Sequence, residues 1–227
     1  MHHPAIIYAD NHIAVIYKPA GLPVHKNNHM PNDAPYLTKW AGQYFNASVY
    51  NVHRLDAKTS GLVVLAFDSK IANLLTTQFA RQEVKKSYTA IVRGVLSNEG
   101  LLEKPVLNKK KGKLVNARTA YKTLKTIETN ISYKTFNNIS ISLVTLYPET
   151  GRWHQLRQQL AFERNDIIGD NQHGDRMLNH IIEDLTGEKK LYLHACSLGF
   201  MHPEKGIFKV FEAPAPDAFD VLMDALG

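Results

Sequence analysis

The chain has 227 residues, of which 44% are hydrophobic and 21% charged, with a formal net charge of +6 and a sequence pI of about 9.2. This composition excludes an intrinsically disordered chain, and no apolar run is long enough to cross a membrane. The single cysteine, Cys196, excludes an internal disulfide and a cysteine-cluster metal site, and it favours the cytoplasm. The positive charge favours a polyanionic partner, although many soluble proteins are mildly basic.

The chain opens with a predicted β-hairpin. Residues 5–8 and 13–17 are two apolar runs separated by four residues that include Asp10 and Asn11. The following Lys-Pro-Ala-Gly-Leu-Pro segment, residues 18–23, ends the second strand because proline and glycine interrupt regular structure.

A polar loop is expected over residues 25–35. His25 and His29 are four residues apart, a spacing that suits two metal ligands on a helix. The intervening asparagines and the nearby Pro31 disfavour a helix, so we interpret both histidines as solvated loop residues. Residues 36–45 are expected to form a short helix.

The most informative stretch is residues 51–65, Asn-Val-His-Arg-Leu-Asp-Ala-Lys-Thr-Ser-Gly-Leu-Val-Val-Leu. Its continuous apolar end predicts a short buried strand, so Asp56 is expected in the loop that enters this strand. Such a loop holds a reactive group firmly while leaving it accessible. From residue types alone, an Asp that only caps a local turn is the main alternative.

A helix and a strand are predicted next. From Ser69, the expected N-cap, apolar residues recur at helical spacing, and the helix should end near Glu83. Residues 86–94 are expected to form a strand in which Tyr88 shares one face with every second residue after it. A tyrosine in a strand usually packs against its neighbours, but it can also stack on a base.

Residues 108–118 are rich in positive charge and contain no acid. Their five cations are Lys109, Lys110, Lys111, Lys113 and Arg118. Such a run is either a solvated loop or a set of phosphate contacts, and the residues alone leave both open. Residues 117–126 and 139–146 are then expected to form two strands.

A second chemically informative stretch is residues 149–160, where a turn precedes a predicted helix. Trp153 and two leucines recur at helical spacing and should form its buried face. His154 and Arg157 are three residues apart and should share another face. An arginine on a helix is more often a surface group.

The remainder is expected to complete a single fold. Residues 167–175 should form a turn, and residues 176–187 should form a surface insertion. Residues 191–200 and 207–212 are predicted strands, with a short amphipathic helix over residues 216–226.

Four segments together resemble the RluA-type pseudouridine synthases. The Asp56 stretch is similar to the catalytic signature of that family, which is carried by residues 53–56 (His-Arg-Leu-Asp) and 59–62 (Thr-Ser-Gly-Leu). The other three motifs are Lys-Pro-x-Gly at 18–21, Lys-x-Tyr-x-Ala-x-Val-x-Gly at 86–94, and Thr-Gly-Arg-x-His-Gln-Leu-Arg at 150–157. Residues 169–174 are similar to the Gly-Asp-x-x-x-Gly turn of the family.

The resemblance implies a role for each motif residue. Asp56 would be the essential carboxylate, Arg157 would pair with it and keep it ionised, and Tyr88 would stack on the target uracil and take part in the proton step. Arg54 would fill the space left when the uridine flips out of its helix. The expected substrate-binding residues are His53, Arg54, Thr59, Arg152, His154 and Lys86. No metal or cofactor is required.

The resemblance also implies the fold and the substrate. We expect an α+β fold with a mixed, mainly antiparallel sheet and a central catalytic cleft, in a single catalytic domain over residues 1–227 without a separate N-terminal RNA-binding domain. Within the family, residues 22–25 and 168–175 look most like the member that modifies uridine-65 of tRNA. The expected partner is therefore RNA, most specifically tRNA, with no membrane, for a cytoplasmic monomer.

Three alternatives were weighed. A related synthase acting on ribosomal RNA fits the same motifs. A non-catalytic RNA-binding module would explain the basic and aromatic residues but would not need a carboxylate paired to an arginine. A kinase is disfavoured because its catalytic loop has the Asp directly after the Arg, whereas here Leu55 intervenes, and no glycine-rich phosphate loop is present.

Overall fold

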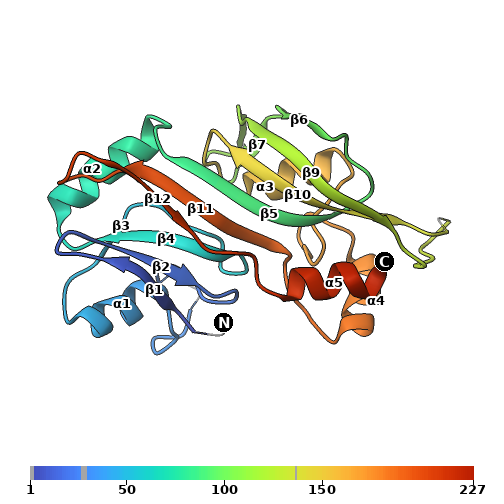
Figure 1. The fold of residues 1–227 in the computed structure, drawn as a ribbon, viewed down its shortest axis with the longest axis horizontal. Coiled ribbons are helices and arrows are strands. Elements are labelled where there is room, and N and C mark those ends of the chain that lie inside the picture. Colours follow the sequence, from blue (N-terminus) through green and yellow to red (C-terminus); the bar gives the residue numbers. More distant parts are fainter. Residues whose placement is uncertain (1–2, 27–29, 136) are drawn as a thin grey trace. The chain divides into compact units, whose positions relative to one another are not determined.

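The computed structural model describes residues 3–26, 30–135 and 137–227, so His29 lies outside the described residues. The chain forms two compact units. One consists of Met1–Lys86 with Ala195–Pro214, and the other of Ser87–His194 with Ala215–Gly227. The fold is α+β with a mixed, mainly antiparallel sheet, as predicted (Figure 1). The central cleft and the single catalytic domain stay predictions.

The first unit contains the strands that carry the Asp56 loop. Its elements are β1 (Ala5–Ala9), β2 (Ile13–Lys18), α1 (Leu37–Phe45), β3 (Tyr50–Asn51), β4 (Ser60–Ala66), α2 (Ser69–Ala80), most of β11 (Leu193–Met201) and β12 (Phe208–Glu212). The strand order is β1-β2-β4-β11, with β3 on β4 and β12 on β11. Val15 of β2 lies opposite Val64 of β4 in an antiparallel pair.

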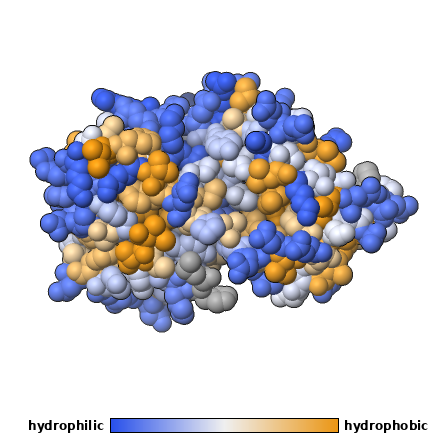
Figure 2. Space-filling model, viewed as in Figure 1, coloured by the Kyte–Doolittle hydropathy of each residue, from blue (hydrophilic) through white to orange (hydrophobic). Residues whose placement is uncertain are grey.

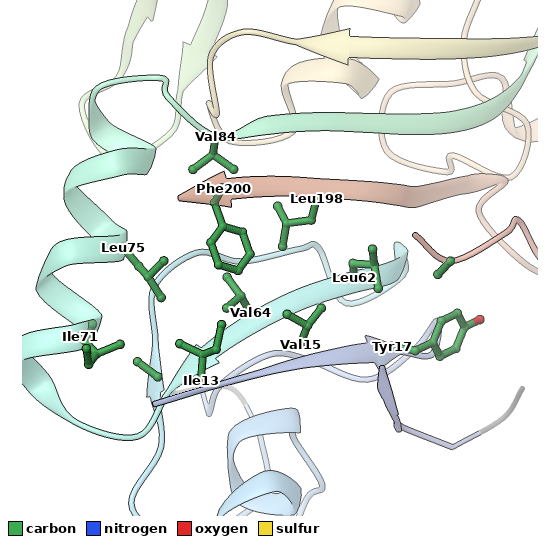
Figure 3. Packing of buried hydrophobic residues seen from close by; sticks show 13 residues of the cluster. Ile13, Val15, Tyr17, Leu62, Val64, Ile71, Leu75, Val84, Leu198 and Phe200 are labelled. Atoms are coloured by element: carbon green, nitrogen blue, oxygen red, sulfur yellow. The ribbon is translucent and has the colours of Figure 1, made fainter. Parts of the chain in front are cut away.

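The core of the first unit explains why β2 and β4 are continuous apolar runs. Both strands are buried at every residue, and their only polar members are Lys18 at the end of β2 and Ser60 at the start of β4. In Figure 3, Ile71 and Leu75 of α2 and Phe200 of β11 surround Val64 and Ile13. This cluster covers one face of the strand that follows Asp56, and the burial of Val63 and Leu65 shows that its other face is covered as well.

The second unit is built on an antiparallel sheet in the order β5-β10-β9-β6, with a separate β7–β8 hairpin. Its elements are most of β5 (Lys85–Arg93), β6 (Glu99–Leu102), β7 (Val106–Asn108), β8 (Lys113–Val115), β9 (Thr119–Glu128), β10 (Ser140–Pro148), α3 (Gln155–Phe162), α4 (Arg176–Thr186) and α5 (Ala218–Leu226).

Helices cover both faces of this second sheet. Alternate residues of a strand point to opposite faces. Val92 of β5 packs in a cluster with Leu156 and Leu160 of α3, whereas its neighbour Ile91 packs with residues of α4 and α5 such as Leu178 and Phe219. The sheet thus positions α3, which carries Arg157.

The surface carries apolar residues as well as polar ones. Phe208 and Val210 of β12 are exposed, and Figure 2 shows hydrophobic residues interspersed with hydrophilic ones over the visible face. This is usual for a folded protein surface. Among the described residues, no helix combines the length and hydrophobicity that crossing a membrane requires.

Three predictions about helix positions were wrong. The N-cap of α2 is Asp68 rather than Ser69, because the Asp68 carboxylate accepts a hydrogen bond from Ile71 N at 2.8 Å. This helix ends at Ala80, short of the predicted Glu83. In the second unit, α3 begins at Gln155, so Trp153 precedes the helix instead of lying on its buried face.

The predicted surface insertion over residues 176–187 is also wrong. This segment is α4, and its Leu178 and Ile182 belong to the core. Asp175 caps its start by accepting hydrogen bonds from two backbone N–H groups, and Gly187 ends it in the left-handed conformation.

Gly61, which begins the apolar part of β4, should be irreplaceable by alanine. Its φ is +120°, and an added Cβ would lie 2.2 Å from Ala195 O. Backbone strain and overpacking together should lower the free energy of unfolding of Gly61→Ala by roughly 2–5 kcal/mol. Urea denaturation measures this loss.

The matched control is Gly112→Ala. Gly112 also has a positive φ, +62°, but an added Cβ there meets no atom within 4 Å. Only backbone strain should act, at about 1–2 kcal/mol. Equal losses for the two variants would contradict the close approach at Gly61.

Candidate active site

Asp56 lies in the loop between β3 and β4 and is half-buried. This confirms the prediction that it precedes a buried strand. Two backbone hydrogen bonds shape the loop: Thr59 N donates to Asp56 O at 3.0 Å, and Gly21 N donates to Ala57 O at 2.8 Å. The loop is therefore tied both to itself and to the segment that follows β2.

Lys18 contacts this loop, and it was assigned no role from the sequence. It ends β2 and has no exposed surface, and its Nζ donates to Ala57 O at 3.0 Å and to Pro19 O at 2.9 Å. Burial lowers the pKa of Lys18 to about 7, while the negative charge of Asp56 acts in the opposite direction. A buried amine is thus placed close to the Asp56 carboxylate.

His53 anchors the loop to β4. Its Nε2 accepts a hydrogen bond from Val64 N at 3.0 Å, and its ring stacks on Phe79 of α2 with centroids 4.5 Å apart. Burial lowers the pKa of His53 to about 3, and the charge of Lys86 acts in the same direction. His53 is therefore neutral at physiological pH. Its predicted contact with substrate stays a prediction.

The other predicted substrate contacts of the first unit differ in exposure. Arg54 is exposed, and its charge adds to the effect of burial in lowering the pKa of His25. Thr59 is buried, and its hydroxyl has no hydrogen-bond partner among the described residues. Lys86 is half-buried, which lowers the pKa of its ammonium group to about 8. The proposed contacts of Arg54, Thr59 and Lys86 with RNA stay predictions.

Arg157 is buried on α3 and makes a bidentate ion pair with Asp170. Its Nε donates to Asp170 Oδ2 at 2.7 Å and its Nη2 donates to Asp170 Oδ1 at 2.8 Å. Burial would raise the pKa of Asp170, but hydrogen bonds and the charge of Arg157, helped by the backbone N–H groups of Gln172 and His173, lower it overall. Two bonds in one plane fix the orientation of the guanidinium group.

His154 contacts Arg157, but the predicted common helix face is wrong, because His154 precedes α3 and has a left-handed backbone conformation. His154 Nε2 lies 2.9 Å from Arg157 Nη1, and His154 Nδ1 lies 2.9 Å from His173 Nε2. Because arginine can only donate, His154 Nε2 must accept. His154 then carries its proton on Nδ1 and donates to His173. In this arrangement His154 is neutral and is held at both ring nitrogens.

Tyr88 and Arg152 complete the predicted residues of the second unit. Tyr88 is half-buried on β5, opposite Leu146 of β10, and packs beside the cluster that contains α3. Arg152 is exposed, and its Nε donates to Asn116 O at 3.4 Å. The Asn116 end of the basic segment therefore lies next to the turn before α3.

The structure brings Lys18 close to Asp56 in the first unit, and Asp170, His154 and His173 to Arg157 in the second. The pairing of Arg157 with Asp56 stays a prediction. Sequence reasoning treated Lys18 as the end of a strand and Asp170 as part of a turn. Lys18 lies in the Lys-Pro-x-Gly motif and Asp170 in the Gly-Asp-x-x-x-Gly turn. Their place in these motifs was the signal that could have indicated a role for them. Among the described residues, no group of three histidine, cysteine or acidic side chains is arranged to hold a metal ion.

Comparison with known proteins points to one family. The RNA pseudouridylate synthase family matches residues 12–162. The tRNA pseudouridine synthase C of Yersinia pestis is 34% identical over 232 positions, covering 98% of this chain and 90% of that protein. The protein of the same name from Pasteurella multocida is 37% identical over 208 positions, covering 87% of this chain and 86% of that protein.

Solved structures agree with the sequence comparison. The human RNA pseudouridylate synthase domain containing 4 is similar with a TM-score of 0.74 and 27% identity, covering 98% of this chain and 92% of that one. The human RNA pseudouridylate synthase domain containing 1 has a TM-score of 0.75 at 21% identity, with 97% and 88% covered, and this second likeness concerns the fold alone.

Proposed function

The chain belongs to the RNA pseudouridylate synthase family, and we propose that its substrate is tRNA, with uridine-65 as the target. The enzyme is an isomerase that converts a uridine in RNA to pseudouridine. The N-glycosidic bond from N1 of the base to the sugar breaks, the base turns, and a bond from C5 to the sugar replaces it; C5 loses its proton and N1 gains one, so the composition is unchanged. The relatives that match nearly the whole chain are named as tRNA enzymes, and this supports tRNA as substrate.

Asp56 is proposed as the essential carboxylate. The observation that carries this proposal is the anchoring of its loop: the backbone of Ala57 is held by Lys18, and His53 ties the other side of the loop to β4. Asp56 itself stays half-buried, so it is held firmly without being enclosed. A catalytic group needs this combination, because small displacements from the reactive geometry are costly in rate.

Arg157 and Tyr88 are proposed as its catalytic partners. Arg157 would supply the positive charge that keeps Asp56 ionised, and its pair with Asp170 holds the guanidinium plane ready for this task. Because Nε has one hydrogen and Asp170 accepts it, the contact with Asp56 would use Nη1 or Nη2. Tyr88 would stack on the uracil and offer its hydroxyl for the proton step.

The cellular setting is also a proposal. We place the enzyme in the cytoplasm, for which a single cysteine is typical, and propose that it acts as a monomer. A dimer measured by light scattering at working concentration would contradict the monomer. The alternative substrate, ribosomal RNA, is distinguished by the following experiment.

Mapping of pseudouridines in total RNA tests the proposed target. Cells that lack this protein should lose pseudouridine at position 65 of tRNA, and the wild-type protein should restore it. The exposed Asp184 of α4 provides a control, since Asp184→Asn should restore the modification as well. Loss of a modification only in ribosomal RNA would replace tRNA by the alternative substrate.

The β7–β8 hairpin is proposed to neutralise RNA phosphates. It carries four exposed lysines, three in its turn and one at the start of β8, here called the hairpin lysines: Lys109, Lys110, Lys111 and Lys113. Each phosphate contact adds roughly 0.7–0.9 to the slope of log affinity against log salt, so replacing all four by alanine should reduce the slope by up to about 3.6. Binding of labelled tRNA at several salt concentrations gives this slope.

A matched set of four exposed lysines provides the control. It consists of Lys70, Lys122, Lys125 and Lys189. Their replacement by alanine removes the same net charge but leaves the hairpin intact. If both quadruple variants changed the slope equally, the hairpin would have no special role in binding RNA.

A further inference from the structure

Trp153 is a large aromatic residue that does not belong to the hydrophobic core. It is half-buried, it precedes α3, and none of the three hydrophobic clusters formed by the described residues includes it. Its backbone is nevertheless firmly held: the Gln155 side chain accepts hydrogen bonds from Arg152 N and Thr150 Oγ1, and Gln158 Nε2 donates to Trp153 O at 2.8 Å. A rigid, partly exposed indole therefore stands at the start of α3.

One face of this indole is covered by His154. The two rings stack with centroids 3.9 Å apart and planes 19° apart, and His173 meets the indole edge-on at 6.0 Å. His154 is itself held at both ring nitrogens, by Arg157 and His173. The stack is thus an extension of the network around Arg157, and it fixes the direction in which the other face of Trp153 points.

A lysine lies over the indole ring. Lys109 Nζ lies 5.6 Å from the centroid of the Trp153 ring, within the range of a cation–π contact. His154 stacks too closely for an ammonium group or a base to fit between the two rings, so only the face away from His154 is available to a base. Lys109 is exposed and its side chain is flexible, so it can leave the ring to pair with a phosphate.

Gln158 fixes the distance between the hairpin and Trp153. Its Oε1 accepts a hydrogen bond from Leu107 N at 2.8 Å, and its Nε2 donates to Leu107 O at 3.3 Å as well as to Trp153 O. The same side chain therefore holds β7 and the indole in place. Arg152, bonded to Asn116 O, adds a second exposed cation beside them.

We propose that Trp153 is a stacking site for an RNA base, distinct from the target uracil, with Lys109 pairing to a neighbouring phosphate. An aromatic face bordered by cations is the chemistry that binds an unstacked nucleotide, because the ring stacks on the base while the cations meet the backbone. This inference rests on the proposed function, since it assumes an RNA substrate. It adds a second contact that would hold RNA next to the Arg157 network.

The two tryptophans of the chain allow a direct test. Trp40→Phe leaves Trp153 as the only indole, and Trp153→Phe leaves only Trp40, which stacks on Tyr44 of α1 and has no cation placed over its ring among the described residues. A stacked base quenches indole emission. Unmodified tRNA transcript should therefore quench the emission of the Trp40→Phe protein and leave that of the Trp153→Phe protein unchanged.

Binding affinity supplies an independent measurement. Base stacking on an aromatic residue contributes about 1–3 kcal/mol, so Trp153→Ala should weaken tRNA binding roughly 5- to 150-fold, and Trp153→Phe should recover most of the loss. A tryptophan with a purely structural role would show neither the quenching nor the recovery by phenylalanine. Anisotropy of labelled tRNA measures the affinity, and thermal unfolding checks the fold of each variant.

The outcomes separate this inference from the proposed function. If the Trp40→Phe protein binds tRNA and forms pseudouridine but its emission is unchanged at saturation, the stacking site is wrong and the function stands. If the wild-type protein neither binds tRNA nor forms pseudouridine in it, both proposals fail. Equal quenching of both single-tryptophan proteins would also overturn the assignment to Trp153.

Discussion

A buried amine holds the loop on which the proposed chemistry depends. Lys18 is fully enclosed at the end of β2, and its Nζ donates to the carbonyl oxygen of Ala57, the residue next to Asp56. Burying an amine is unfavourable, which is why its pKa falls to about 7 despite the nearby carboxylate. The fold tolerates this because the amine joins two segments 39 residues apart in sequence and places positive charge beside Asp56.

The second unit also contains a buried cation, Arg157, that is held by hydrogen bonds. Arg157 donates two hydrogen bonds to the Asp170 carboxylate. This carboxylate also accepts hydrogen bonds from backbone N–H groups of its own loop. A buried ion pair of this kind contributes little net stability compared with apolar residues, so its value lies in orientation. The third guanidinium nitrogen contacts His154, and through it the network reaches His173 and Trp153. The residues around the start of α3 therefore have two roles: they orient the Arg157 guanidinium group, and they provide the proposed contact with RNA.

The sequence revealed those features that depend on local pattern. The continuous apolar run after Gly61 predicted the buried strand β4, and the stretch that contains Arg157 predicted a helix, although His154 lies just before α3 and reaches Arg157 from there. The pairing of Arg157 with Asp170 joins two different segments, and no periodicity connects them.

Two further features were not predicted from the sequence, for different reasons. Lys18, followed by a proline, reads as the exposed end of a strand, and only the folded neighbourhood shows that it is buried. The helix α4 could have been predicted, because Leu178, Ile181, Ile182 and Leu185 recur at helical spacing, but the polar residues among them, such as Asn179 and Glu183, favoured the interpretation as a surface insertion. Propensity and pattern describe a segment, whereas burial depends on what packs against it.

The role of Asp56 is the central claim, and Asp56→Asn tests it most directly. The substitution is nearly isosteric and removes only the charge and the basicity of the carboxylate. The measurement is tritium release from tRNA labelled at C5 of uracil, since that hydrogen is lost when the new carbon bond forms. The account predicts a variant that unfolds at the wild-type temperature to within a few degrees and binds tRNA, yet releases no tritium. Release at the wild-type rate would contradict the assignment of Asp56 as the essential carboxylate.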